Sequence, residues 1–394
     1  MTPHKPAIDR FALRLAAFYG GVFAALGIQM PFLPVWLAAK GLDAGAIGTV
    51  LAAPLILRIF AVLVTGAADH MGALRGVLIM TAAATAAGHA LLGLASGFWA
   101  ILVMASLATA ALTSIFPLAD AYALKGLAMR SRSYGSVRVW GSGAFIAGSL
   151  GAGLLLDMMR PADLIWPMVG AFFAMTLLSA WLQPLEDGAR PRASPGSGAF
   201  LRSPAFLAVT SAASLIQASH AVYYGFSTLD WRAAGLSGHA IGALWAVGVI
   251  AEIILFAVSG RLPVGPGMLL GLGAAGAVVR WGVMALDPPL LLLPVLQGLH
   301  GLSFGATHLG AVLFLARAAP DRLGATAQGY LAIATGAAMA ASTALSGLLY
   351  GVYGGRAYAA MAVAAMIGGL LALVAHRLWR DHTPQGRILS AKAD

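Results

Sequence analysis

The chain has 394 residues, of which 60% are hydrophobic and only 10% are charged, whereas an average soluble domain carries about 25% charged residues. This composition excludes an ordinary soluble protein and indicates that lipid is the solvent for most of the chain. The net charge of +10 does not predict a nucleic-acid partner, because the basic residues are scattered between apolar runs. The absence of cysteine excludes disulfides and cysteine-based metal sites.

Apolar runs long enough to cross a bilayer follow one another along the whole sequence. A spanning helix needs about 20 predominantly apolar residues, and the 49 glycines are typical of helices that pack closely in lipid. The sequence therefore predicts twelve spanning helices, at residues 11–37, 43–68, 74–95, 98–124, 134–157, 163–183, 204–230, 237–260, 266–286, 289–317, 322–350 and 355–379.

The longest polar interruption, EDGARPRASPGSGAFLRS at 186–203, divides the twelve runs into six and six. It is rich in proline, glycine, serine and arginine, which predicts a flexible linker. We expect a six-helix bundle at 1–183, a cytoplasmic linker at 184–203 and a second six-helix bundle at 204–394, with a substrate cavity between the bundles.

The distribution of lysine and arginine predicts the orientation of the helices. With both termini inside, the inner segments hold seventeen basic residues and the outer segments hold four, namely Lys40, Arg160, Arg232 and Arg356. The remaining three of the 24 lie inside helices. We therefore expect a multi-pass protein of the inner (plasma) membrane with both termini in the cytoplasm.

The segment GAADHMGALRG at 66–76 joins the second and third predicted helices on the inner side. It resembles the Gly-x-x-x-Asp-Arg-x-Gly-x-Arg loop of the major facilitator superfamily. Gly66, Asp69, Gly72 and Arg75 match that pattern, and His70 stands where the pattern has arginine. The resemblance implies a gating loop in which Asp69 accepts hydrogen bonds from a helix end; the alternative is a polar turn that matches by chance.

A few ionisable residues lie inside the predicted helices, where a charge costs roughly 3 kcal/mol or more. Such groups usually face a bundle interior or a water-filled cavity and mark a transport pathway, although static packing pairs are the alternative. Helical rise places Glu252 and His308 in one layer, and Arg280, His300 and His220 in a second layer nearer the outside. The full set is Arg58, Arg138, Arg280, Asp120, Glu252, His220, His300 and His308.

The three arginines of this set outnumber its two carboxylates, so fixed positive charge remains in the predicted interior. Arginine cannot lose its proton in a protein, and its guanidinium suits a carboxylate. We therefore expect an anionic substrate. Aromatic side chains accompany the charges: Tyr223 shares a helix face with His220, and Trp245 shares one with Glu252. These residues favour an organic acid with an aromatic or apolar body.

Glu252 is one of only two glutamates in the chain and lies in the middle of the apolar segment LWAVGVIAEIILFAVSG, 244–260. Removal from water disfavours its charged form. We therefore expect Glu252 to bind and release a proton, and a pairing with Arg280 or His308 would couple that proton to substrate binding.

Two stretches carry a closer resemblance. Asp120 and the run SYGSVRVWGS, with Arg138 eighteen residues after the acid, resemble the helix 4–5 region of lactose permease. Residues 220–257, 278–284 and 296–311 resemble helices 7–10 of the phenylpropionate permease family. That family implies proton-coupled uptake of 3-phenylpropionate. It also implies that Asp120 and Arg138 bind substrate and that Glu252, Arg280 and His300 serve binding and proton coupling. Ser303 stands where lactose permease has an acid.

Together these observations predict an all-α integral membrane protein with the major facilitator fold, acting as a proton-coupled uptake carrier for a small organic acid. The predicted substrate-binding residues are Arg58, Asp120, Arg138, Tyr223, Trp245 and Arg280, and the predicted proton-coupling residues are Glu252, His300 and His308. We expect a monomer with no metal and no cofactor.

Three alternatives stay open at this point. A proton-antiport exporter of hydrophobic compounds would share the fold and the acid at Glu252. A receptor or assembly factor could use the same fold without transport, although it would not need the intramembrane charges. An enzyme is not expected, because the sequence has no nucleophile–base cluster, phosphate-binding glycine loop or HExxH pattern.

Overall fold

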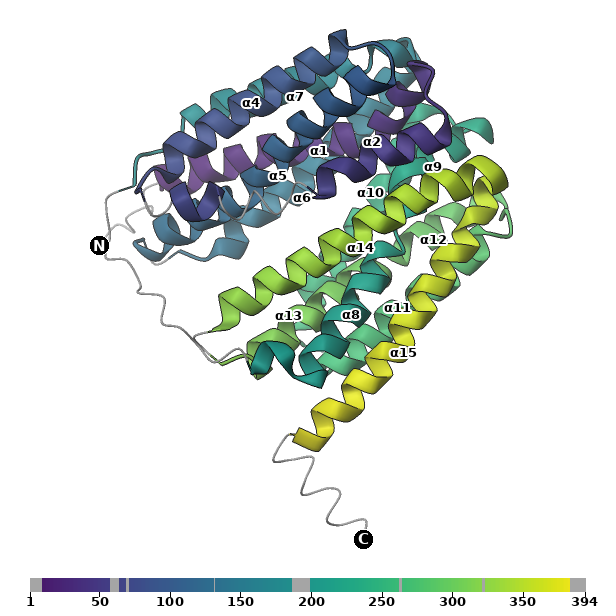
Figure 1. Ribbon diagram of the computed structural model, residues 1–394. Coiled ribbons are helices and arrows are strands. Elements are labelled where there is room, and N and C mark those ends of the chain that lie inside the picture. The colour runs from purple at the N-terminus through teal and green to yellow at the C-terminus, as the bar shows by residue number, and fades with distance from the viewer. Residues whose placement is uncertain are drawn as a thin grey trace, which may run out of the picture. The chain divides into compact units, whose positions relative to one another are not determined.

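The computed structural model describes residues 9–56, 64–68, 71–130, 132–185, 199–261, 264–320 and 323–382. These residues form helices joined by short turns and contain no strand. The helices are α1 (Arg10–Ala39), α2 (Ala44–Ile56), α4 (Leu74–Leu94), α5 (Phe98–Ala128), α6 (Tyr134–Met158), η1 (Pro161–Asp163), α7 (Ile165–Ala180), η2 (Phe200–Arg202), α8 (Pro204–Ala218), α9 (Ala221–Ala233), α10 (Gly238–Ser259), α11 (Pro266–Met284), η3 (Leu290–Leu292), α12 (Leu293–Gly298), the π-helical η4 (Gly301–Ala306), α13 (Thr307–Ala318), α14 (Gly324–Tyr353), η6 (Gly354–Ala357) and α15 (Tyr358–His382) (Figure 1).

The described helices match the predicted spans in number and order. Ten segments are long and apolar enough to cross a membrane. One of them, Thr326–Leu378, has 53 residues and covers most of both α14 and α15, which raises the number of spanning helices to eleven. The shorter apolar helix α2 is the twelfth. The predicted twelve-helix, all-α architecture is therefore confirmed.

Contacts divide the chain into two compact units. Unit 1 comprises Met1–Leu42, Leu57–Ala189 and Trp231–Ala246. Within it α1 packs against α6 and α7, and α4 packs between α5 and α7. Figure 1 shows α4 and α7 running side by side.

Unit 2 comprises Asp43–Ile56, Arg190–Asp230 and Val247–Asp394. In this unit α15 packs against α8 and α11, and α14 packs against α2 and α8. A hydrophobic core around Phe206, Leu270 and Phe314 holds α8, α11 and α13 together. Residues 186–198 lie outside the described part of the chain, so the predicted domain boundary at the linker stays a prediction.

Each unit includes a segment from the other side of the linker in the sequence. Residues 43–56, which are α2 and the residue before it, belong to unit 2. Residues 231–246, which include the first half of α10, belong to unit 1. Asp157 at the end of α6 strengthens the second of these attachments. Its two carboxylate oxygens accept hydrogen bonds from the backbone N–H groups of Gly238 (2.6 Å) and His239 (2.9 Å), which cap the first turn of α10.

Glycines let the backbones approach closely where these segments pack. A Cβ atom at Gly48 of α2 would lie 2.7 Å from the Cα atom of Gly347 in α14. A Cβ at Gly242 of α10 would lie 2.4 Å from the carbonyl oxygen of Ser149 in α6. In lipid, where apolar side chains gain nothing from leaving water, such close backbone contact supplies much of the packing energy.

We predict that Gly242→Ala destabilises the protein, because the new methyl group meets a backbone atom that cannot move aside. The expected loss is about 1–3 kcal/mol, as for other overpacked sites. Gly271→Ala on α11 is the matched control, since a Cβ there has nothing within 4 Å and alanine favours a helix by about 0.5–1 kcal/mol. Thermal unfolding of the two purified variants compares them, and equal melting temperatures would contradict the close-packing interpretation.

Candidate functional site

The break between α8 and α9 places His220 at the centre of a buried polar cluster in unit 2. The helix ends at Ala218, and the Ser219 hydroxyl and the His220 imidazole bind carbonyls of its last turn. Ser219 donates to the Ile216 carbonyl (2.6 Å), and His220 Nδ1 lies 3.1 Å from the Gln217 carbonyl oxygen. Because a carbonyl only accepts, His220 Nδ1 carries a proton. The other ring nitrogen, Nε2, faces Ser303.

Arg280 of α11 lies against this break and is completely buried. Its Nη1 donates to His300 Nδ1 (3.0 Å) and to the Ser303 hydroxyl (3.3 Å), and its Nη2 donates to Gln297 Oε1. The guanidinium carbon also lies 4.5 Å from the Tyr223 ring centre and 4.4 Å from that of Trp281. These partners are neutral side chains and aromatic faces.

No described carboxylate lies within ion-pair distance of Arg280, and its Nε has no hydrogen-bond partner among the described residues. A buried charge of this kind is expensive unless it is paired. The site therefore favours an added anion.

The hydrogen bonds of Arg280 determine the protonation of the histidines around it. A guanidinium only donates, so His300 Nδ1 must accept, and His300 is neutral with its proton on Nε2. Ser303 accepts from Arg280 and lies 3.0 Å from His220 Nε2. A second positive charge beside the buried Arg280 is disfavoured, so His220, with its proton on Nδ1, is neutral and accepts from the Ser303 hydroxyl through Nε2.

Glu252 of α10 lies on the other side of His300. Its Oε2 is 3.8 Å from His300 Nε2, and its side chain is 24% exposed. The distance is longer than a hydrogen bond, but the protonated Nε2 faces the carboxylate. His300 thus stands between the guanidinium of Arg280 and the carboxylate of Glu252, with one ring nitrogen turned to each.

The structure also describes the predicted residues Tyr223 and His308 of unit 2 and Trp245 of unit 1. Tyr223 is buried against Arg280, and Trp245 is buried on α10. His308 is exposed and stacks on Phe304, which in turn stacks on His300. The predicted layer of Arg280, His300 and His220 is thus formed, and the two histidine rings lie 5.4 Å apart.

In unit 1 the predicted pair Asp120 and Arg138 occupies a second cluster. The Tyr19 and Tyr134 hydroxyls both donate to Asp120 Oδ1, at 2.6 and 2.7 Å. The guanidinium carbon of Arg138 lies 3.9 Å from the ring centre of Phe23 and 5.7 Å from that of Tyr19. Both charged side chains are half-buried, and no ion pair joins them.

The predicted gating loop is described in part. Gly66 is exposed on a short helical stretch, and Gly72 has a φ of +69°, which favours glycine. Arg75 donates from Nε to the Leu182 carbonyl (2.7 Å) and from Nη2 to the Ala180 carbonyl (2.8 Å), so it binds the end of α7. Asp69 and the predicted substrate residue Arg58 lie outside the described residues.

The charge pattern of the sequence did not single out several residues of these clusters. Gln297, Tyr19 and Tyr134 carry no charge at neutral pH, and Ser303 was noted only as a missing acid. A further buried pair, Gln29 and His89, lies in unit 1, with 3.0 Å between the two Nε2 atoms. His89 could have been found as a histidine in an apolar run.

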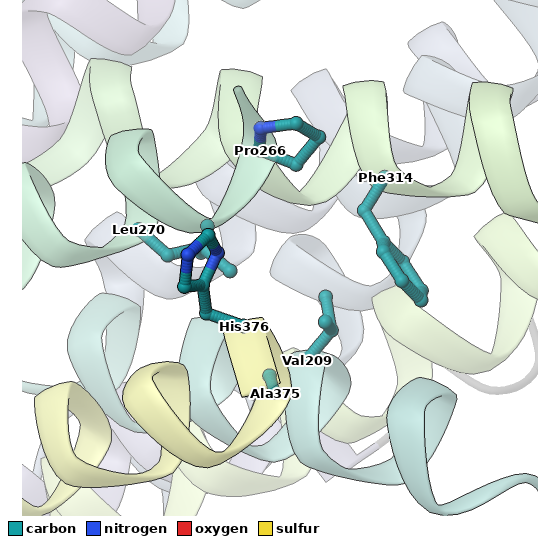
Figure 2. A pocket seen from close by; sticks show the side chains of 7 residues that line it. Val209, Pro266, Leu270, Phe314, Ala375 and His376 are labelled. Carbon is teal, nitrogen blue, oxygen red and sulfur yellow. The ribbon is translucent and has the colours of Figure 1, made fainter. Parts of the chain in front are cut away.

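The described residues contain no group of three or more His, Cys, Asp or Glu side chains that could hold a metal ion. Figure 2 shows a small pocket at one end of unit 2, lined by Val209, Pro266, Gly267, Leu270, Phe314, Ala375 and His376. Its volume of about 10 Å³ has room for about one water molecule. It cannot hold an organic substrate.

Comparisons with known proteins agree with this architecture. At 34% identity, covering 89% of this chain and 94% of the relative, the chain is similar to a protein named "Probable 3-phenylpropionic acid transporter" of Escherichia coli strain K12. It is 28% identical to the maltose permease of Geobacillus stearothermophilus, over 91% of this chain and 92% of that protein.

Solved structures show the same fold at low sequence identity. A mutant of the nucleoside transporter NupG superimposes with a TM-score of 0.80 at 14% identity, covering 93% of this chain and 99% of the other. A bacterial homologue of the lysosomal transporter Spinster gives a TM-score of 0.74 at 14% identity, covering 97% and 100% of the two chains.

The sequence matches the MFS_1 like family over residues 12–360. This match spans most of the chain and includes both polar clusters. The chain therefore belongs to the MFS_1 like family, and it is a multi-pass membrane transporter with the major facilitator fold rather than an enzyme.

Proposed function

We propose that this protein is a secondary active transporter that takes up a small organic acid together with protons. The observation that carries the proposal is the buried guanidinium of Arg280, which no described carboxylate neutralises. A substrate carboxylate would supply the missing negative charge. A neutral sugar or nucleoside would leave the charge buried and unpaired, which costs several kcal/mol.

The tautomer of His300 supplies a physical basis for proton coupling. In the structure its Nδ1 accepts from Arg280. A proton added to His300 puts a second N–H on the ring, which then opposes the N–H of Arg280. The imidazolium is tolerated only when Arg280 turns to another acceptor. Binding of a carboxylate to Arg280 and of a proton to the His300–Glu252 pair therefore favour each other.

The substrate class follows from the surroundings of this charge and from the relatives. Aromatic faces of Tyr223 and Trp281 flank Arg280, and such faces suit an acid with an aromatic body. The relative named for 3-phenylpropionic acid transport is 34% identical. We therefore propose 3-phenylpropionate or a similar acid.

The remaining predicted residues take roles around this exchange. In the proposal, Arg280 binds the acid beside Tyr223. Asp120, Arg138 and Trp245 of unit 1 stay predicted substrate-binding residues. Glu252 and His300 carry the proton. His308, exposed beyond Phe304, is the next titratable group along the helix and a step on the proton path. Gly66, Gly72 and Arg75 belong to the gating loop.

We also propose that the protein works as a monomer in the inner (plasma) membrane with both termini in the cytoplasm. The orientation is supported by the excess of lysine and arginine in the segments that it places inside. Import as the direction of transport rests on the resemblance to the phenylpropionate permease family, which implies uptake.

The first prediction concerns ligand binding. 3-Phenylpropionate should raise the melting temperature of the purified protein, since a ligand at a hundred times its Kd stabilises by about 2.7 kcal/mol. Arg280→Lys should remove most of this stabilisation, because an ammonium group cannot reproduce the geometry of the guanidinium. Arg160→Lys, whose side chain is 82% exposed beside Asp163, is the control and should retain it. Stabilisation by maltose or a nucleoside but by no acid would contradict the proposed substrate class.

The second prediction concerns Glu252. Glu252→Gln keeps size and hydrogen-bonding capacity but cannot release a proton. In proteoliposomes it should abolish uphill uptake driven by a pH gradient, while downhill exchange of substrate continues. Asp230→Asn is the matched control, because Asp230 is a half-buried carboxylate of unit 2 that binds Tyr350 (3.2 Å) away from His300. If Glu252→Gln still accumulates substrate, Glu252 is a packing residue and the proton travels by Asp120 or the histidines.

The third prediction tests orientation and uses the absence of cysteine from the chain. Arg232→Cys should react with a membrane-impermeant maleimide added outside intact cells. Arg317→Cys should react only after the membrane is permeabilised. Both arginines are exposed, so access to the reagent decides the result. The reverse pattern of labelling would place the termini outside.

A further inference from the structure

The Asp120 cluster of unit 1 contains an arrangement that the proposed transport function does not explain. One carboxylate oxygen, Oδ1, accepts two tyrosine hydroxyls from two different helices, Tyr19 of α1 (2.6 Å) and Tyr134 of α6 (2.7 Å). The Tyr19 ring is buried, and it meets the Tyr134 ring edge-on with 6.2 Å between the centres. The two tyrosines therefore fix Asp120 from both sides.

Arg138 shares these neighbours but does not bind the acid. It lies one turn after Tyr134 on the same face of α6, and its guanidinium carbon is 5.7 Å from the Tyr19 ring centre. Its stronger aromatic contact is with Phe23, at 3.9 Å. No hydrogen bond or ion pair joins the guanidinium to another residue of the described chain.

This separation needs a cause, because a carboxylate and a guanidinium with a common neighbour would ordinarily pair. Two phenolic O–H groups give Asp120 charge-assisted hydrogen bonds, which are stronger than neutral ones. They satisfy the acid without Arg138. The Phe23 face in turn holds the plane of the guanidinium and leaves its N–H edges available.

We propose that Tyr19 and Tyr134 are positioning residues that hold Asp120 away from Arg138, so that the guanidinium stays available for the carboxylate of the substrate. This inference rests on the proposed function, since it takes Arg138 as an anion-binding residue. The tyrosines act through Asp120 and do not touch the substrate carboxylate. Without their hydroxyls, Asp120 turns to Arg138 and competes with the substrate for it.

The test is a double-variant cycle on the affinity for 3-phenylpropionate, measured by isothermal titration of the purified protein. Tyr134→Phe removes one hydroxyl and keeps the ring. It should weaken binding about tenfold, equivalent to about 1.4 kcal/mol. In an Asp120→Asn background the same change should have no effect, because asparagine carries no charge with which to compete for Arg138.

Two further variants separate this role from general packing. Tyr122→Phe is the matched control: Tyr122 lies on α5 two residues after Asp120, is buried, and donates to the Gln183 carbonyl (2.6 Å) instead. It should leave the affinity unchanged. Tyr19→Phe repeats the test from α1 if Tyr134→Phe does not fold.

The outcomes distinguish the inference from the function on which it rests. If the wild-type protein binds no carboxylate ligand, both fall. If it binds 3-phenylpropionate and Tyr134→Phe binds equally well, the positioning role alone is wrong. An equal loss of affinity in the wild-type and Asp120→Asn backgrounds would also overturn it, since the effect would then not pass through the acid.

Discussion

A buried and permanently charged guanidinium, that of Arg280, is the constraint on which the rest of unit 2 depends. Its fully buried position would be costly if its N–H groups were not occupied. His300 Nδ1, the side chain of Gln297 and Ser303 of the π-helical turn η4 supply acceptors for it. Irregular helix geometry at this depth is tolerated because it is enclosed by protein. The π-helical turn thus presents one of the side chains that occupy the N–H groups of the charge.

Close backbone contacts add to the hydrophobic core in holding the helices together. At Gly48 and Gly242 a methyl group would meet a neighbouring backbone. Such contacts fix the distance between helices within narrow limits. They also attach α2 to unit 2 and the first half of α10 to unit 1. The second half of α10, which carries Glu252, belongs to unit 2.

The sequence predicted the helices well because a bilayer imposes a length and a composition on every span. It also predicted that Arg280, His300 and His220 lie in one layer, because charged and titratable residues are rare in apolar runs and helical rise gives their depth. It could not predict the partners that decide chemistry. Ser303, Gln297 and the tyrosines of the Asp120 cluster are neutral and common, and only their hydrogen bonds reveal them. His308 shows the limit of depth alone: it lies on the expected helix but is exposed beyond Phe304.

The two clusters share one arrangement of charge. In unit 2 an arginine and a carboxylate lie on opposite sides of His300. In unit 1 an arginine and a carboxylate share the neighbours Tyr19 and Tyr134 without pairing. In both places a guanidinium rests on aromatic faces instead of closing an ion pair. A closed pair is satisfied and gives a ligand little to gain. An arginine kept from its acid by a neutral side chain retains its attraction for an anion. Keeping opposite charges apart is therefore the physical condition that the binding of an acid and a proton in one cycle, as we propose it, requires.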